Sequence, residues 1–272
     1  MRANMHTHSV YCDGRDTPRE MAETAIEKGF DILGFSGHGG SPYDECGMKE
    51  DALKHYLEDV NALKDELKDR ITIYTGIEED MTCRIASKDP FDFVIGSVHF
   101  LNEGKDTQPI DASEEEFVKI LQESFHGDFL AMAKQYYESV AKMKDYEEID
   151  IIGHLDLLTK YNEDERYVKF DDPAYLAIAE DCIHALGNER IYEVNTGAIA
   201  RGYRKTPYPS PSLLKILKEI GAKLMLNSDC HDRRYLDCAF DSSLELIKTI
   251  GFQELYILKD GAFIPVPIEQ FH

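Results

Sequence analysis

The segment NMHTHSVYCDGRDTPREMAETAIEKGFDILGFSGH, residues 4–38, contains a strand, a helix and a second strand in that order. Short runs of strand-forming residues predict the two strands at residues 4–8 and 32–36. The helix between them begins at a capping box, TPRE from Thr17, with proline at its first position, and Gly29 is placed to end it. Such a unit predicts two parallel strands joined by a helix.

The same alternation continues along the chain, and several strand segments are continuous apolar runs, as in strands covered on both faces. Seven or eight such units in 272 residues favour a closed (β/α) barrel. A doubly wound open sheet stays an alternative, although no glycine-rich phosphate-binding fingerprint follows the first strand. The predicted strands are residues 4–8, 32–36, 72–75, 93–97, 150–153, 191–195 and 223–227, with a weaker candidate at 254–258.

One connection is longer than the others. Residues 100–150 contain about two helical patterns and an acidic loop, where one helix would suffice. No linker rich in proline, serine or glycine divides the sequence. We therefore expect a single domain over residues 1–272, with an elaborated connection at about 100–150.

The composition argues against several classes of function. The chain carries 52 Asp and Glu against 30 Lys and Arg, a net charge of −22, which disfavours a nucleic-acid-binding surface. Hydrophobic residues make up 43% of the chain, enough for a core, and no apolar stretch approaches a membrane span. The six cysteines form no C-x-x-C pair, and the amino terminus has no apolar signal region. We expect a cytoplasmic protein without nucleic-acid or membrane partners, and the oligomeric state stays open.

Histidine and acidic residues follow the predicted strands. In a parallel barrel the carboxyl ends of all strands open onto one face, and that face carries the active site. A single histidine at a strand end is usually an ordinary polar residue, but chance does not readily place His or acid at six strand ends. We therefore expect one site built from His6, His8, His38, Glu78, His99, His154, Asp229 and His231.

The spacing within two pairs indicates metal binding. Residues two apart on a strand point to the same side, so that His6 and His8 can reach one ion. Asp229 and His231 have the same relation. Imidazole with carboxylate suits Zn²⁺, Mn²⁺ or Fe²⁺ rather than Ca²⁺. Eight candidate ligands exceed the needs of one tetrahedral ion, which predicts several ions with Glu78 as a bridge.

Together, the motifs HTHSVYCDG, SGHG, GIEED, GSVH, GHLD and NSDCH resemble the polymerase-and-histidinol-phosphatase (PHP) family of metallophosphoesterases over essentially the full length. Within that family the chain is most similar to histidinol-phosphatases, on the stretches HFLNEGKDTQPID, FHGDF, YYESV and EVNTGAIARGYRKTPYPS. The resemblance implies a distorted parallel (β/α)7 TIM-like barrel with two to three divalent ions (Zn, Mn or Fe) at its mouth.

The resemblance also implies a ligand set. Asp13 matches a position where relatives carry His or Asp at variable spacing, so that a solvated Asp13 would leave the third ion weakly held. Asp156 is either a neighbour of the ligands or a helix cap. The matching positions are His6, His8, Glu78 and Asp229 for the first ion, Glu78, His99 and His154 for the second, and Asp13, His38 and His231 for the third.

The activity that the resemblance implies is hydrolysis of L-histidinol phosphate to L-histidinol and phosphate, in histidine biosynthesis. Two close divalent ions lower the pKa of a shared water, and the hydroxide attacks the phosphorus in line. For the phosphate, Arg201 is preferred to Arg204 because it comes earlier after the sixth strand. The leaving alkoxide would take its proton from His231 or from a water on the third ion. We expect catalytic roles for Asp229, His231 and Arg201, and substrate contacts from Arg201, Arg204, Asn195 and Phe100.

Three alternatives stay open at this point. Another phosphoesterase of the same family would act on nucleotides or on phosphotyrosine. An amidohydrolase-type barrel also carries H-x-H on its first strand, but it does not explain His38 and Glu78 after the second and third strands. A non-catalytic metal-binding domain is disfavoured because the ligand set is intact and the sequence carries no partner domain.

Overall fold

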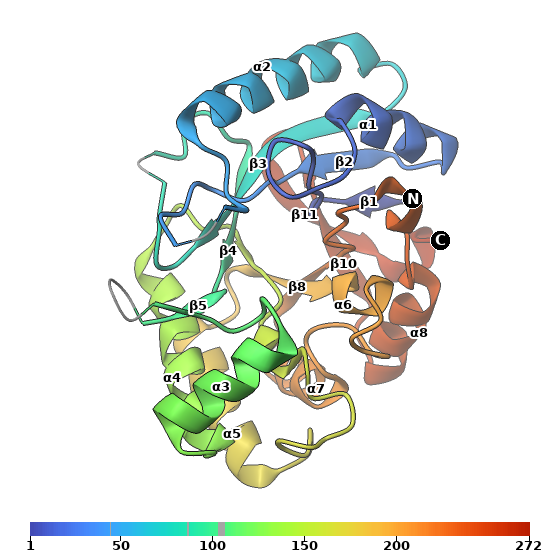
Figure 1. Ribbon diagram of the computed structural model, residues 1–272. Helices are drawn as coiled ribbons and strands as arrows, with labels where there is room; N and C mark the ends of the chain where they lie inside the picture. The colour runs from blue at the N-terminus through green and yellow to red at the C-terminus, as the bar shows by residue number, and fades with distance from the viewer. Residues whose placement is uncertain (44, 86, 103–106) are drawn as a thin grey trace.

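Seven parallel strands form the centre of the molecule (Figure 1). The computed structural model describes residues 1–43, 45–85, 87–102 and 107–272. The strands occupy the predicted segments, although β1 and β7 are shorter than expected and β3 continues to Asp80. In their order in the sheet, the strands are β1 (Ala3–Asn4), β2 (Ile32–Phe35), β3 (Thr72–Asp80), β4 (Phe93–Ser97), β7 (Ile151–Ile152), β8 (Ile191–Asn195) and β9 (Lys223–Asn227).

The sheet closes into a barrel just beyond the ends of β1 and β9, where Thr7 and Cys230 form a parallel bridge. The N–H of His8 donates to the carbonyl of Cys230 at 2.9 Å, and the N–H of Cys230 donates to the carbonyl of His6 at 3.1 Å. This closure confirms the predicted barrel over an open sheet. It also places the H-x-H segment directly beside the segment that carries Asp229 and the histidine after it.

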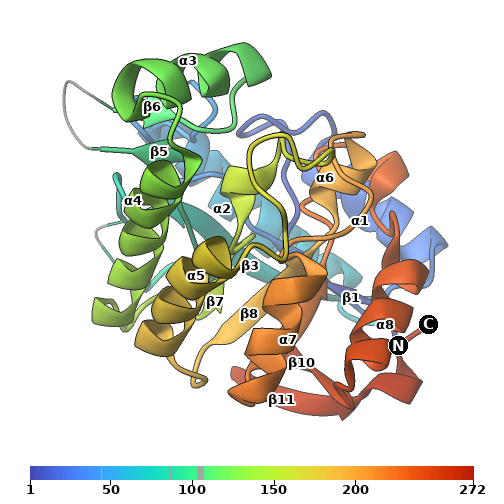
Figure 2. The ribbon, with the colours of Figure 1, turned by 90° about the horizontal axis from the view of Figure 1, so that it is seen from below.

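Helices cover the outside of the barrel (Figure 2). The capping box at Thr17 is present, because the N–H of Thr17 donates to Glu20 Oε2 at 2.9 Å and the N–H of Glu20 donates to Thr17 Oγ1 at 3.3 Å. No helix in the described parts of the chain is long and apolar enough to cross a lipid bilayer. The connecting helices are α1 (Pro18–Glu27), α2 (Glu50–Leu67), α5 (Pro173–Leu186), α6 (Gly197–Ala200), α7 (Pro211–Glu219) and α8 (Phe240–Ile250).

The barrel is distorted between β3 and β4, where the described residues of the connection form no helix. Asp80 at the end of β3 is followed by turns and loop, and β4 begins at Phe93. Short 3₁₀ helices are found in other connections, at Lys142–Asp145, Leu157–Thr159 and Arg233–Tyr235, and after the last strand, at Ile268–Gln270.

The long connection after β4 forms a hairpin and two helices. β5 (Phe100–Leu101) pairs antiparallel with β6 (Gln108–Pro109), and α3 (Glu114–Phe125) and α4 (Phe129–Ala141) follow. These are the two helices that the sequence indicated. Within the HFLNEGKDTQPID stretch, residues 103–106 lie outside the described residues.

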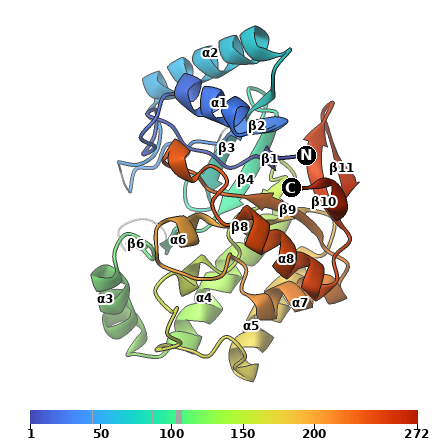
Figure 3. The same ribbon diagram turned by 90° about the vertical axis from the view of Figure 1, so that its right-hand side faces the viewer.

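A separate apolar cluster fills the inside of the barrel. An antiparallel hairpin of β10 (Glu254–Lys259) and β11 (Ala262–Pro267) closes its amino-terminal end (Figure 3). The weaker strand predicted at residues 254–258 therefore belongs to this hairpin and is not an eighth barrel strand. The cluster consists of Ala3, Met5, Ile32, Tyr74, Phe93, Ile95, Ile151, Ile191, Met225, Ile257, Leu258 and Val266.

Phe93 packs directly against the backbone of Gly76 inside the barrel, where a Cβ on the glycine would lie 2.3 Å from the ring. We expect Gly76→Ala to lower the free energy of unfolding by about 1–3 kcal/mol through overpacking, measured by urea unfolding. In the Phe93→Leu background the same substitution should cost less, because the ring is gone. An equal cost in both backgrounds would contradict the contact.

Candidate metal centre

One buried carboxylate, that of Glu78 near the end of β3, lies at the centre of the site, with only 1% of its surface exposed. The shortest separations to imidazoles are 2.9 Å from its Oε1 to His154 Nε2 and 3.0 Å from its Oε2 to His38 Nδ1, and Ser97 Oγ donates to Oε1 at 2.6 Å. The structure thus brings imidazoles from the ends of four other strands to this carboxylate. Five imidazoles approach the two oxygens to 3.5 Å or less, those of His6, His8, His38, His99 and His154.

The barrel seam places a second acid beside this cluster. Asp229 follows β9, and its Oδ1 lies 3.7 Å from His6 Nε2 and 3.2 Å from His8 Nε2. Asp229 has a φ of 49°, a left-handed conformation that Asp adopts more readily than most residues. Both imidazoles are fully buried. The H-x-H pair and Asp229 therefore direct their polar atoms to one point.

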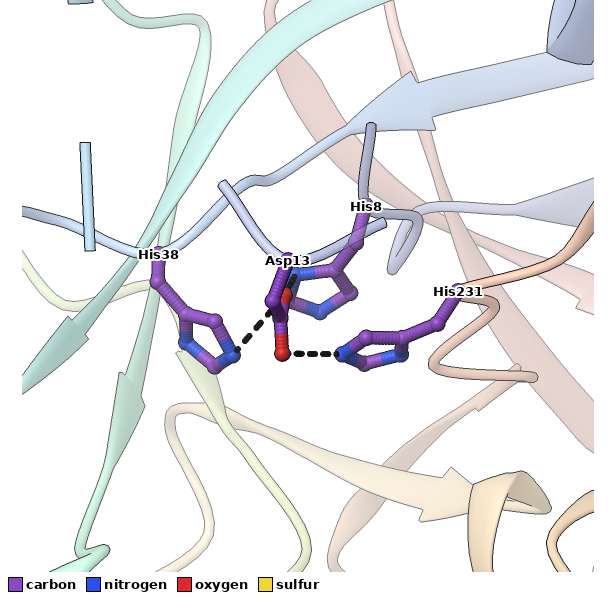
Figure 4. Close-up of side chains that lie close together, drawn as sticks. All are labelled: His8, Asp13, His38 and His231. Carbon is purple, nitrogen blue, oxygen red and sulfur yellow. Dashed lines mark ion pairs between the residues drawn. The ribbon is translucent and has the colours of Figure 1, made fainter. Parts of the chain in front are cut away.

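Asp13 joins a third group near the mouth of the barrel. Figure 4 shows its carboxylate between the rings of His38 and His231, with His8 close by. Asp13 Oδ2 lies 3.2 Å from His231 Nε2, and its Oδ1 lies 3.7 Å from His38 Nε2. One ligand atom from each of the four residues lies within 4.8 Å of the others. Asp13 is an exposed residue of a turn, and its carboxylate faces the cluster.

His99 is oriented by Asp80, the last residue of β3, which the sequence did not single out. Asp80 Oδ2 accepts the backbone N–H of His99 at 2.6 Å and lies 3.3 Å from its Nδ1. The opposite ring nitrogen, Nε2, lies 3.4 Å from Glu78 Oε1. A carboxylate that holds one nitrogen of an imidazole leaves the other available to a metal ion.

The charges within the cluster stabilise one another. Burial alone would raise the pKa of Glu78, but the imidazoles of His6, His38 and His99 hold it well below its usual value. The neighbouring carboxylates raise the pKa of these three imidazoles in spite of burial. Burial and the adjacent imidazoles lower the pKa of His8 to about 3. Positive charge is thus required next to Glu78, and a divalent ion can supply it in place of the imidazole protons.

Several nitrogen and oxygen atoms of the cluster that could bind a metal ion have no hydrogen-bond partner among the described residues. His6 Nε2, His8 Nε2 and Glu78 Oε2 are buried and make no hydrogen bond within the described part of the chain. Because buried polar atoms are nearly always paired, such atoms aimed at one another fit the surroundings of a cation. Imidazole with carboxylate is the donor set that Zn²⁺, Mn²⁺ and Fe²⁺ prefer. The residues present therefore fit divalent metal ions.

A pocket of about 610 Å³ opens above the cluster. Arg201, which follows α6, reaches into it, and its Nη2 donates to Asp229 Oδ2 at 2.9 Å. The walls combine cations, acids and aromatic rings, namely Arg15, Tyr43, Phe100, Asp111, Glu116, Lys160 and Arg201.

Lys160 is a pocket residue that the sequence did not single out. Its Nζ donates to the backbone carbonyl of Asp111 at 2.6 Å, and it lies 4.9 Å from the centre of the Tyr203 ring. Only 11% of its side chain is exposed. Because the lysine follows the 3₁₀ segment Leu157–Thr159 and is not directly at a strand end, its position could be found only from the fold.

Arg204 and Asn195, two of the expected substrate contacts, do not line this pocket. The Arg204 guanidinium is fully buried, with Nη1 3.5 Å from Asp156 Oδ2 and donating to Thr159 Oγ1 at 2.7 Å. Asp156 also accepts the N–H of Ser210 at 2.9 Å. The loop after α6 turns back, so that Arg204 points into the protein while the arginine three residues earlier faces the pocket. Arg204 and Asp156 thus tie two loops together.

Asn195 instead contacts a carboxylate that the sequence did not mark, Glu193 in the middle of β8. Asn195 Nδ2 donates to Glu193 Oε2 at 2.9 Å, and His6 Nδ1 lies 2.7 Å from Glu193 Oε1. Glu193 is fully buried. The sequence feature that could have indicated Glu193 is its position inside the apolar run IYEVN, because a charge in a buried strand requires buried partners.

Residues 4–197 match the model of the PHP domain, which is most of the chain. The chain belongs to the PHP family. A protein of Deinococcus radiodurans named "Probable histidinol-phosphatase" is 29% identical over 260 residues, which cover 90% of this chain and 92% of the relative. The histidinol-phosphatase of Bacillus subtilis is 26% identical over 265 residues, with 88% and 97% covered.

A solved structure has the same fold. The histidinol phosphate phosphatase of Lactococcus lactis, determined with zinc, L-histidinol and phosphate, superimposes with a TM-score of 0.73 at 24% identity. The match covers 97% of this chain and 98% of the other. It supports the TIM-like barrel described above.

The central position of Glu78 leads to a test of the metal centre. We expect Glu78→Gln to lose at least one bound metal ion per chain, because the amide removes the charge that several imidazoles share. Metal content after zinc loading and dialysis, measured by elemental analysis, checks this.

The matched control is the neighbouring Glu79, which is also buried but pairs with Arg84, 3.3 Å away. Glu79→Gln should keep the metal content of the unmodified protein. An equal loss in both variants, or none in Glu78→Gln, would remove Glu78 from the metal centre.

Proposed function

We propose that this PHP protein is a metal-dependent phosphatase that hydrolyses L-histidinol phosphate to L-histidinol and phosphate. The observation that carries the proposal is a single pocket with a histidine–carboxylate cluster at its base and both cationic and acidic side chains on its walls. Relatives named histidinol-phosphatases match nearly the whole chain, which supports the same activity here.

The cluster would hold two to three divalent ions. Zinc is our first choice because the Lactococcus lactis relative was determined with zinc, and manganese or iron would suit the same donors. When bound, such ions activate water and neutralise charge on phosphate oxygens. The proposed ligands are His6, His8, Asp13, His38, Glu78, His99, His154, Asp229 and His231.

Arg201 and Lys160 are the proposed contacts to the phosphate group. Both side chains line the pocket above the cluster. The Arg201 guanidinium is held by Asp229, whose Oδ2 accepts from Nη2 at 2.9 Å, and its Nη1 lies 3.1 Å from His231 Nδ1. A guanidinium fixed in this way can present two parallel N–H groups to a phosphate. Lys160 would add a second positive charge.

The acidic wall of the pocket suits the rest of the substrate, which carries an ammonium group and an imidazole. Asp111 and Glu116 line that wall. Burial opposes ionisation of Asp111, but the neighbouring Lys160 lowers its pKa, so that the carboxylate stays charged. Phe100 offers an aromatic surface beside them. A cationic amine would therefore meet negative charge on one side while its phosphate faces the cations.

The direct test is phosphate release from L-histidinol phosphate, AMP and a phosphotyrosine peptide. The zinc-loaded protein should favour L-histidinol phosphate by about 100-fold or more in kcat/KM, because unpaired pocket charges penalise the other esters. A chelator should abolish the activity and zinc should restore it. Equal rates on all three compounds would contradict L-histidinol phosphate as the specific substrate. No phosphate release from any of them, with metal bound, would favour a metal-binding domain without catalytic activity.

The position of Arg201 leads to a mutational prediction. Arg201→Ala should lower kcat/KM for L-histidinol phosphate by about 100- to 1,000-fold, because a fixed donor to the phosphate is lost. Steady-state kinetics on the folded variant check this.

Lys205 provides the control, since it belongs to the same basic loop but its side chain is 83% exposed. Lys205→Ala should retain the kinetics of the unmodified protein. If Arg201→Ala behaved like Lys205→Ala, the phosphate contact would have to be assigned to another cation.

A further inference from the structure

Glu193 has an unusual environment for a side chain that neither lines the pocket nor belongs to the proposed metal ligands. It is fully buried within β8. Its two oxygens accept four hydrogen bonds, two on each oxygen. Three of the donors, a backbone N–H and two side-chain amides, cannot accept a hydrogen bond, which fits an ionised carboxylate that accepts at every position. A buried negative charge destabilises the fold unless hydrogen bonds or a nearby positive charge compensate it.

The first partner is a proposed metal ligand. His6 Nδ1 lies 2.7 Å from Glu193 Oε1, and a carboxylate can only accept, so Nδ1 carries the proton. The other nitrogen of the same ring, Nε2, is then free of its proton in the neutral ring. Nε2 lies 3.1 Å from Glu78 Oε2 and makes no hydrogen bond among the described residues. Glu193 thus selects the form of His6 that can donate a lone pair to a metal ion.

The other oxygen reaches a second ligand. Glu193 Oε2 accepts the backbone N–H of His154 at 2.9 Å. This bond sets the backbone at the end of β7, from which the His154 ring extends to Glu78 Oε1 at 2.9 Å. One carboxylate therefore positions histidines that follow two different strands.

The last two partners fix Glu193 itself. Asn227 Nδ2 donates to Oε1 and Asn195 Nδ2 donates to Oε2, both at 2.9 Å. Asn227 Oδ1 in turn accepts the N–H of Met5 at 2.8 Å, across the barrel seam. The network joins β8 and β9 to the segment that carries His6. Because every acceptor site is engaged from a different direction, the carboxylate has little freedom to rotate.

We propose that Glu193 is a positioning residue of the metal centre, which fixes the tautomer of His6 and the orientation of His6 and His154 and thereby strengthens metal binding. The inference rests on the metal centre of the proposed function and adds a residue that touches neither metal nor substrate. Removal of such a carboxylate behind a metal-bound histidine typically weakens metal binding by about 10- to 100-fold.

The test uses Glu193→Gln in the full chain. Zinc affinity, measured by competition with a chromophoric chelator, should fall by about 10- to 100-fold. The glutamine amide has only one accepting oxygen, and its NH2 group cannot accept the hydrogen bonds that the second carboxylate oxygen accepts. The control is Asp156→Asn, which changes a fully buried acid that pairs with Arg204 and contacts none of the proposed ligands. It should bind zinc as the unmodified protein does. Unchanged zinc affinity in Glu193→Gln would overturn the proposal.

A second measurement does not depend on the variant folding. Long-range ¹H–¹⁵N spectra of the unmodified, zinc-loaded protein report which nitrogen of each imidazole carries the proton, and comparison with His6→Asn identifies the His6 signals. We expect His6 to be protonated on Nδ1. A proton on Nε2 would refute the assignment. Neither measurement requires turnover, so that a protein inactive on L-histidinol phosphate would contradict the proposed function and leave this inference to be judged by itself.

Discussion

The rest of the structure depends on the burial of one carboxylate among five imidazoles. A charge with 1% exposure is tolerated only where opposite charge surrounds it, and Glu78 obtains that environment from segments spread over most of the chain. The imidazoles come from strand ends on both sides of β3, and closure between the ends of β1 and β9 places Asp229 beside His6 and His8. Barrel closure thus completes the site.

The two ends of the barrel have separate tasks. The interior near the amino ends of the strands is apolar, with Phe93 packed on glycine backbone and the β10–β11 hairpin as a cover. The carboxyl ends carry polar and charged groups, and the loops beyond them form the pocket. This division lets the loops vary in chemistry while the opposite end supplies stability. The elaborated connection through β5, β6 and α3 is an example of this division. The connection adds Phe100, Asp111 and Glu116 to the pocket without adding a strand to the barrel.

Much of the fold and the cluster could be predicted from the sequence, whereas the supporting residues could not. His6, His38 and Asp229 follow strands and Glu78 lies near the end of one, and a strand end in a parallel barrel has a known location. Arg204 shows the limit, since it is three residues from Arg201 in the same loop yet is buried against Asp156. Loop direction is set by contacts that have no period in the sequence. The weaker strand at residues 254–258 was placed correctly, but only the structure showed that it pairs in a hairpin.

The sequence by itself determined the order of strands and helices, the closed barrel as the favoured architecture and the group of imidazoles and carboxylates at the strand ends. These follow from local rules, namely helix caps, apolar runs and the two-residue repeat of a strand. Tertiary structure alone decided that Glu193 supports His6, that Asp80 orients His99 and that Lys160 reaches the pocket. Each of these depends on which side chain a buried charge meets across strands or loops, and such partners are chosen by packing in three dimensions, where distance along the chain carries no information.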